Sequence, residues 1–268
     1  MNLQLKGRLA LVSGSTAGIG NAIAAALAAE GARVIVNGRT QEAVDRAVAE
    51  LRAAAGVAAA GGEVMGFAGD LTTAAAAAAL ALRHPGVEIL VNNLAIFEPK
   101  PFEEITDADW SRFFDANVVS GVRLARLYLP AMKKANWGRI IFISSESAVQ
   151  IPAEMIHYGV TKTAQLAVSR GLAETVAGTG ITVNSVLPGP TKSRGVGDFV
   201  AQMAKGSGVS PEQFEREFFE KIRPSSLIKR FASTAEVASL VAYVASPLAS
   251  ATTGAALRVD GGVIKSAF

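Results

Sequence analysis

The chain contains no cysteine. Disulfides and cysteine-based metal sites are therefore excluded, and we expect no bound metal. No apolar run reaches about 18 residues, so we expect no membrane span and no membrane partner. There is also no basic block, and a net charge of only +3 does not indicate a nucleic-acid partner. A first strand begins almost at the N-terminus, which leaves no room for a signal peptide, so we expect a cytoplasmic protein.

What is present is enough apolar sequence to bury one large core. The chain has 268 residues, 50% of them hydrophobic. Neither a linker nor a repeat of about 20 to 50 residues divides it. We therefore expect a single domain that spans residues 1–268.

Short apolar segments recur along the chain, with helix-favouring stretches between them. The expected strands are 9–12, 33–36, 63–67, 89–91, 139–143, 181–186 and 256–259. Apolar strands that alternate with helices indicate a parallel sheet covered by helices on both faces. The predicted fold class is therefore α/β, a doubly wound Rossmann-type sheet, and ligands bind outside the carboxyl ends of such strands.

A glycine-rich turn, Ser13-Gly14-Ser15-Thr16-Ala17-Gly18-Ile19-Gly20, follows the first expected strand. An alanine-rich helix candidate and a second strand come next, which is the setting that a dinucleotide-binding turn requires. Glycines let backbone N–H groups approach a pyrophosphate, and a helix N-terminus favours its charge. A glycine turn without a ligand is the alternative. The candidate cofactor-binding residues of this turn are Gly14, Ser15, Thr16, Gly18, Ile19 and Gly20.

Tyr158 and Lys162 stand four residues apart in the stretch HYGVTK, and Ser145 precedes the tyrosine by thirteen residues. On a helix, side chains four apart lie on one face. A nearby ammonium would favour the phenolate and lower the pKa of Tyr158 from about 10. Such a phenol is a usable general acid or base for a carbonyl and alcohol pair, and Ser145 could bind the same oxygen.

Together these residues resemble the short-chain dehydrogenase/reductase family, and within it the 3-oxoacyl-(acyl-carrier-protein) reductases. The likeness runs from Gly7 to Gly262. In this resemblance Tyr158 exchanges a proton with the substrate oxygen, while Lys162 tunes Tyr158 and holds the nicotinamide ribose. Ser145 binds the substrate oxygen, and Asn117 anchors a water that relays the proton to Lys162. The nicotinamide supplies or accepts the hydride.

The resemblance implies further cofactor contacts. Asp70-Leu71 matches a pair that contacts adenine, and Pro188-Gly189-Pro190-Thr191 matches the segment beside the nicotinamide. Asn92-Asn93-Leu94-Ala95 matches an Asn-Asn-Ala-Gly segment but departs from it at the last two positions. The residues carried over are Asp70, Leu71, Asn93, Ala95, Pro188, Gly189 and Thr191, beside Tyr158 and Lys162.

The end of the second strand bears on cofactor choice. NAD-type sites place an acid there, about 20 residues past the glycine turn, to bond the ribose hydroxyls. Gly38 stands at that position, and Arg39 follows it. No carboxylate would repel a 2′-phosphate, and Arg39 could pair with one, so we favour NADP(H) over NAD(H). The alternative is that Arg39 is only solvated.

The substrate is less clear. The segment at about 192–226 corresponds to the family's variable substrate loop, and it contains an apolar stripe at helical spacing: Phe214, Phe218, Phe219 and Ile222. It forms either a lid over the substrate or a cover for core or subunit contact. Between Ser145 and Tyr158 lie polar residues that either bind a polar substrate or are solvated: Glu146, Gln150, Glu154 and His157.

We therefore expect an NAD(P)(H)-dependent oxidoreductase that interconverts a carbonyl compound and a secondary alcohol. A 3-oxoacyl-thioester reductase is the leading hypothesis, and a sugar, polyol or steroid dehydrogenase is the alternative. A non-catalytic nucleotide-binding regulator is a third, but it has no need of the complete catalytic set. Relatives are commonly tetramers, and the expected helices 107–134 and 158–177 are apolar on more than one face. We therefore also predict a homo-oligomer, specifically a tetramer.

Overall fold

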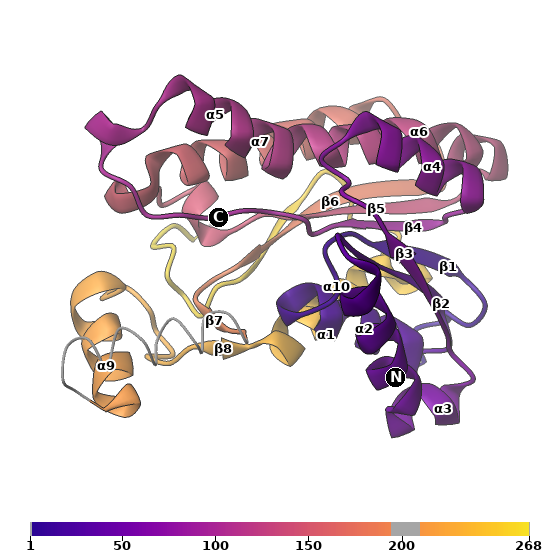
Figure 1. Ribbon diagram of the computed structural model, residues 1–268, viewed down its shortest axis with the longest axis horizontal. Helices are drawn as coiled ribbons and strands as arrows, with labels where there is room; N and C mark the ends of the chain where they lie inside the picture. The colour runs from indigo at the N-terminus through magenta and orange to yellow at the C-terminus, as the bar shows by residue number, and fades with distance from the viewer. Residues whose placement is uncertain (1, 194–209, 268) are drawn as a thin grey trace.

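The computed structural model describes residues 2–193 and 210–267. Its centre is a sheet of seven parallel strands in the order β3-β2-β1-β4-β5-β6-β9 (Figure 1). The strands are β1 (Leu9–Val12), β2 (Arg33–Gly38), β3 (Glu63–Ala68), β4 (Ile89–Asn92), β5 (Gly138–Ile143), β6 (Ile181–Pro188) and β9 (Ala256–Val259). The doubly wound parallel sheet predicted from the sequence is confirmed.

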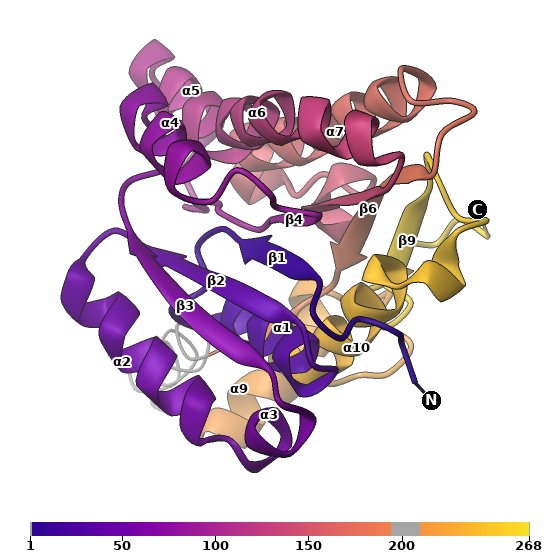
Figure 2. The ribbon, with the colours of Figure 1, turned by 90° about the vertical axis from the view of Figure 1, so that its right-hand side faces the viewer.

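Helices cover both faces of this sheet (Figures 1 and 2). One face carries α4 (Ala74–Arg83), α5 (Asp107–Phe114), α6 (Ser120–Ala135) and α7 (Ile156–Glu174). The other carries α1 (Gly18–Ala29), α2 (Gln41–Ala53), α3 (Ala55–Ala60) and α10 (Thr234–Ala245). Within the described ranges, none of the helices combines the length and the apolar character needed to cross a membrane.

Alternating strand side chains divide the core into two layers. On β2, Val34 and Val36 are fully buried in the layer that includes residues of α1 and α10. Ile35 points the opposite way, into the layer that includes Leu80 of α4 and Leu124 of α6. Because both faces are buried, the strands are apolar throughout rather than alternating with polar residues.

Several short elements surround the carboxyl edge of the sheet. They are η1 (Phe102–Glu104), η3 (Glu146–Ala148), η4 (Ala153–Met155) and a two-stranded sheet of β7 (Thr191–Lys192) with β8 (Ala232–Ser233). At the opposite edge, η6 (Pro247–Ala249) follows α10, and Arg139 at the start of β5 donates to the Ser246 carbonyl oxygen just before it. Part of the expected substrate loop, residues 194–209, lies outside the described residues. The rest forms α9 (Pro211–Glu217) and a π-helical turn, η5 (Phe218–Ile222), in which Phe219 is buried against Phe231.

The helix expected over 107–134 is interrupted. A π-helical turn, η2 (Asp115–Val119), separates α5 from α6, and it contains Asn117. The Asn117 side chain accepts a hydrogen bond from the Ile96 amide at 2.7 Å and donates to the Ile96 carbonyl oxygen at 3.0 Å. Single π-helical turns inside helices often mark functional sites, and this one lies where Asn117 reaches the chain that leaves β4.

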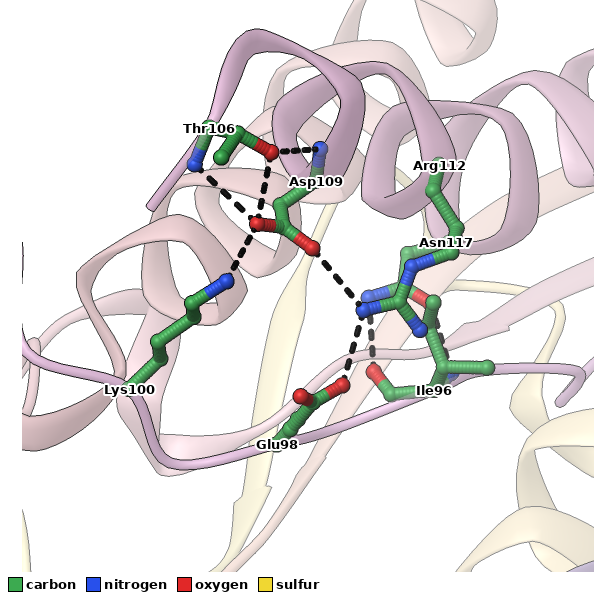
Figure 3. A network of polar contacts seen from close by, with 7 residues as sticks. All are labelled: Ile96, Glu98, Lys100, Thr106, Asp109, Arg112 and Asn117. Carbon is green, nitrogen blue, oxygen red and sulfur yellow. Dashed lines mark hydrogen bonds and ion pairs between the residues drawn. The ribbon is translucent and has the colours of Figure 1, made fainter. Parts of the chain in front are cut away.

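Ion pairs hold that chain segment, residues 96–100, against α5 (Figure 3). Lys100 pairs with Asp109 at 2.7 Å, and Arg112 pairs with Glu98 at 2.7 Å. Asp109 also completes a capping box with Thr106 at the start of α5. These contacts fix the position of Phe97, whose ring meets the edge of Tyr158 with 6.4 Å between centroids.

A close backbone contact fixes α1 against the start of β3. A Cβ atom at Gly62 would lie 2.1 Å from the carbonyl oxygen of Ala28, so only glycine fits there. We expect Gly62→Ala to lower the free energy of unfolding by about 1–3 kcal/mol through overpacking. Gly56→Ala is the matched control, because its Cβ would meet only Ala29 at an ordinary 3.6 Å. Its loss of backbone freedom in the unfolded chain should stabilise by about 0.5 kcal/mol.

Urea unfolding followed by circular dichroism measures both changes. Equal effects of the two substitutions would contradict the close contact between Gly62 and α1.

Candidate active site

The glycine turn lies at the carboxyl end of β1, where the strand order reverses between β1 and β4. Gly14 and Gly18 both have φ of 61°, a left-handed conformation that favours glycine. α1 begins directly after the turn, and no side chain caps its first backbone N–H groups. Such uncapped amides, together with the helix dipole, form a site for an anion.

Two asparagines hold the turn in shape. The Asn37 side chain accepts from the Gly14 amide at 3.1 Å and donates to the Gly69 carbonyl oxygen at 3.1 Å. Asn93 donates from its side chain to the Gly14 carbonyl oxygen at 2.9 Å. A Cβ at Gly20 would lie 2.4 Å from that Asn93 nitrogen, which explains the third glycine. Asn37 was missed by the sequence analysis, and its only signal is a polar residue at the end of an apolar strand.

Ser15 points into the protein and uses its hydrogen-bond donors within the turn. It is fully buried, its hydroxyl donates to the Val12 carbonyl oxygen, and its amide donates to the Asn37 carbonyl oxygen at 2.8 Å. Because both donors are used inside the turn, they are not free to bind a phosphate. Ser15 therefore shapes the turn rather than contacting a ligand through these groups. Thr16 packs against the next strand, where a Cβ at Gly38 would lie 2.4 Å from its methyl group.

The ends of β2 and β3 carry the other predicted contacts. Arg39 is exposed directly after β2, and Asp70 is exposed after β3, where it accepts a hydrogen bond from the Thr72 amide at 3.0 Å. Leu71 is fully buried in the core, so its side chain is not available to adenine. Leu94 also packs against this core. Of the two residues that depart from the family pattern, Leu94 and Ala95, only Ala95 lines the cleft described next.

One cleft of ≈ 470 Å³ opens at the carboxyl ends of β4, β5 and β6. It brings together segments that are far apart in the sequence. The predicted residues that line it are Ile19, Asn93, Ala95, Ser145, Tyr158, Lys162, Pro188, Gly189 and Thr191. The glycines of the turn and Arg39, Asp70, Leu71 and Asn117 lie outside this lining.

Lys162 and Tyr158 meet in the cleft, as their spacing predicts. The Lys162 amine lies 5.6 Å from the centroid of the Tyr158 ring and donates to the Ile143 carbonyl oxygen at 2.8 Å. Burial lowers the pKa of Lys162 to about 7, against an opposing effect of Glu146. Burial also raises the pKa of Tyr158, Glu146 raises it further, and a hydrogen bond with Ser145 lowers it.

The expected lowering of the Tyr158 pKa by Lys162 is therefore wrong for this structure. The sequence pattern places the ammonium near the phenol, but it does not account for desolvation. Removing both groups from water disfavours their charged forms, so the phenol is held protonated and the amine loses its proton more readily.

Asn117 is connected to Lys162 through a residue that the sequence analysis missed. Gln165 donates from its side-chain nitrogen to the Asn117 carbonyl oxygen at 2.5 Å. Its side-chain oxygen accepts from the Lys162 amine at 3.4 Å. The Gln165 side chain thus bridges Asn117 and Lys162. Gln165 follows Lys162 by three residues, and this spacing on one helix face is the signal that could have found it.

The far end of the cleft is charged. Glu146 is 6% exposed, and its carboxylate lies 3.6 Å from the Arg223 guanidinium. Arg223 also pairs with Glu154 at 3.2 Å, and all three residues line the cleft. Arg223 was not predicted, although it directly follows the apolar stripe of the substrate loop. Of that stripe, Phe214, Phe218 and Ile222 line the cleft.

The other two polar candidates between Ser145 and Tyr158 are not part of the cleft lining. His157 is fully buried, and its ring packs against Phe113 with 4.0 Å between centroids. Burial lowers the pKa of His157, so this side chain belongs to the packing between α5 and α7. Gln150 is exposed and donates to the Ser225 hydroxyl at 3.4 Å.

Comparison with known proteins agrees with this geometry. Residues 14–264 match the family model described as enoyl-(acyl carrier protein) reductase. The chain is 46% identical over 268 residues to the uncharacterized oxidoreductase YvaG of Bacillus subtilis, and the match covers 100% of both chains.

Two solved structures share the fold. L-sorbose reductase of Gluconobacter frateurii, complexed with NADPH and L-sorbose, has a TM-score of 0.91 and 30% identity, covering 99% of this chain and 100% of that one. A 7 α-hydroxysteroid dehydrogenase complexed with NADH has a TM-score of 0.83 and 30% identity, covering 99% and 97%. The chain therefore belongs to the short-chain dehydrogenase/reductase family of oxidoreductases, which act on alcohol and carbonyl groups.

Proposed function

We propose that this protein is an NADP(H)-dependent oxidoreductase that interconverts a ketone and a secondary alcohol, with Tyr158 as the general acid and base. The observation that carries the proposal is the convergence of Ser145, Tyr158 and Lys162 in one cleft. The cleft adjoins a glycine turn with an uncapped helix behind it. These are the two parts that hydride transfer to a carbonyl group needs, a proton donor and a dinucleotide site.

The residues present fit a nicotinamide dinucleotide. Gly14 and Gly18 carry no side chain, so a pyrophosphate could approach the backbone beside the α1 N-terminus. The Pro188–Thr191 segment, Asn93 and Ala95 line the cleft, where they would flank the nicotinamide. When bound, the cofactor supplies or accepts the hydride.

Side chains of the protein donate and accept the proton of the reaction. Because burial raises the pKa of Tyr158, its hydroxyl is protonated at neutral pH and can donate to a substrate oxygen during reduction. Ser145, which lines the same cleft, would bind the same oxygen. A phenolate left after that donation would favour the charged form of Lys162, whose pKa of about 7 lets it exchange protons at working pH.

The charge at the far end of the cleft favours the alternative substrate class over the leading one. An acyl-carrier thioester calls for a basic patch at the cleft mouth. Instead, among the described residues, two carboxylates, Glu146 and Glu154, surround the single guanidinium of Arg223 there. The likeness to an L-sorbose reductase and to a 7 α-hydroxysteroid dehydrogenase supports the same direction, towards a hydroxylated substrate of the sugar, polyol or steroid kind whose reacting end is neutral.

The preference for NADP(H) is argued from the end of β2. No acid stands at Gly38, and one could be placed there only if Thr16 moved. Arg39 follows and is exposed, which makes it accessible to the 2′-phosphate.

We also propose a homo-oligomer, a tetramer. An apolar groove of ≈ 370 Å³ lies open between α6 and α7, lined in part by Leu129, Val168 and Leu172. Among the described residues, its lining comes from these two helices alone, and no part of the substrate loop covers it. The same face of a second copy would bury these side chains in a two-fold contact.

Tyr158→Phe removes the proton donor and keeps the ring. We expect kcat for ketone reduction to fall by about 100-fold or more, while NADPH affinity changes little. Steady-state kinetics and a fluorescence titration of NADPH measure the two effects. Tyr243→Phe on α10, where Tyr243 is 40% exposed, is the matched control and should behave as the wild type. A Tyr158→Phe enzyme with wild-type turnover would remove Tyr158 from its role.

Arg39→Asp places a carboxylate where the 2′-phosphate would bind. The affinity for NADPH should fall by about 10-fold or more, and that for NADH much less, because only NADPH carries the phosphate. Arg33→Asp, at the opposite end of β2, makes the same change in charge and should leave both affinities unchanged. Equal losses for the two cofactors, or a wild type that prefers NADH, would contradict the assignment.

Leu129→Lys places a charge in the groove between α6 and α7. Light scattering should show the wild type as a tetramer and the variant as a smaller species, because the buried contact cannot accommodate the ammonium. Leu82→Lys on α4 is the control, since Leu82 is already 85% exposed. A wild type that scatters as a 27.6 kDa monomer would refute the proposed assembly.

A further inference from the structure

A buried carboxylate directly follows the serine that is placed to bind the substrate oxygen. The Ser145 hydroxyl donates to the Glu146 carboxylate at 2.5 Å, and the Arg223 guanidinium lies 3.6 Å from the other carboxylate oxygen. Glu146 is 6% exposed and lines the cleft. It therefore faces the same space as a substrate bound at Ser145 and Tyr158.

Ser145 cannot serve both partners at once. A serine hydroxyl has one hydrogen to donate, and here the Ser145 hydroxyl donates it to the Glu146 carboxylate. In the proposed reaction, Ser145 must instead donate this hydrogen bond to the carbonyl oxygen of the substrate. If Ser145 turned away without replacement, a buried carboxylate oxygen would lose its hydrogen bond, which is unfavourable. A substrate that carries its own donor beside the carbonyl group removes this conflict.

The charges around Glu146 indicate what that donor is. Arg223 lies close enough to repel an ammonium group on the substrate. Glu146 and Glu154 together would repel a carboxylate or a phosphate. A neutral hydroxyl group satisfies Glu146 without meeting either repulsion. Ser145 and Glu146 are also within one hydrogen bond of each other, which suits two oxygens on adjacent carbons.

Most of the rest of the cleft wall is apolar. Phe97, Phe214 and Phe218 line the same cleft, so the body of the substrate would meet mainly aromatic and other apolar side chains. A free sugar would leave most of its hydroxyl groups against these rings.

We propose that Glu146 is a specificity-determining residue that accepts a hydrogen bond from a hydroxyl group on the carbon next to the reacting carbonyl. The substrate class is then a neutral α-hydroxy ketone with an apolar body, or the matching vicinal diol in the direction of oxidation. This inference rests on the proposed function and names its substrate class.

Four aryl ketones that differ only beside the carbonyl test it: acetophenone, 2-hydroxyacetophenone, 2-aminoacetophenone and benzoylformate. NADPH oxidation gives kcat/KM for each. The wild type should prefer 2-hydroxyacetophenone over acetophenone by about 10-fold or more, the range for a hydrogen bond to a charged group. Glu146→Leu should abolish most of this preference, and Glu146→Gln should give an intermediate value because its amide oxygen still accepts. Circular dichroism checks that both variants fold.

Glu154→Gln is the matched control, because it removes a carboxylate from the same Arg223 without touching Ser145. It should change the rates for acetophenone and its hydroxy derivative by the same factor and keep the preference. A wild-type preference for the amino ketone or for benzoylformate would overturn the inference. So would a preference for the hydroxy ketone that survives in Glu146→Leu.

The proposed function is judged separately from the same data. Reduction of acetophenone that Tyr158→Phe abolishes would uphold the proposed function even where the hydroxyl preference fails. Reduction of none of the four ketones would overturn both.

Discussion

The hydrogen bond from the Lys162 amine to the Ile143 carbonyl oxygen ties α7 to the end of β5, and the active site depends on it. The Ser144 hydroxyl reinforces the contact by donating to the Lys162 carbonyl oxygen at 2.9 Å. With α7 held at this point, Tyr158 stands one helical turn away from Lys162 and beside Ser145, which follows the same strand. A strand end and a helix face, distant in the sequence, thus place three polar groups within one cleft.

Burial sets the protonation of the two titratable groups at this site. Taking an amine out of water lowers the pKa of Lys162 to about 7, while burial holds Tyr158 in its protonated form. Both shifts bring the groups into the forms that proton donation to a carbonyl oxygen uses. Gln165 and Asn117 extend the network behind Lys162, so the amine is oriented by protein groups on its far side. The π-helical turn that carries Asn117 is the backbone adjustment that accompanies this network.

Most of the fold and part of the site could be predicted from the sequence. The seven strands were predicted nearly to their ends, because parallel strands buried on both faces are continuous apolar runs. The glycine turn and the pairing of Tyr158 with Lys162 were predicted because each depends only on spacing within a few residues. The interruption near Asn117 could not be predicted, since it depends on a contact with Ile96, a partner on another segment.

The sequence by itself determined the parallel α/β sheet, the position of its glycine turn and the pairing of Tyr158 with Lys162 on one helix face. Periodicity and local spacing encode these features, so no knowledge of distant contacts is needed. Only the tertiary structure decided the inward role of Ser15, the burial of Leu71, the bridge through Gln165 and the meeting of Glu146 with Arg223. It also reversed the expected shift in the pKa of Tyr158. Hydrogen-bond partners and desolvation depend on what the fold brings around a group, and that information is spread over segments far apart in the chain.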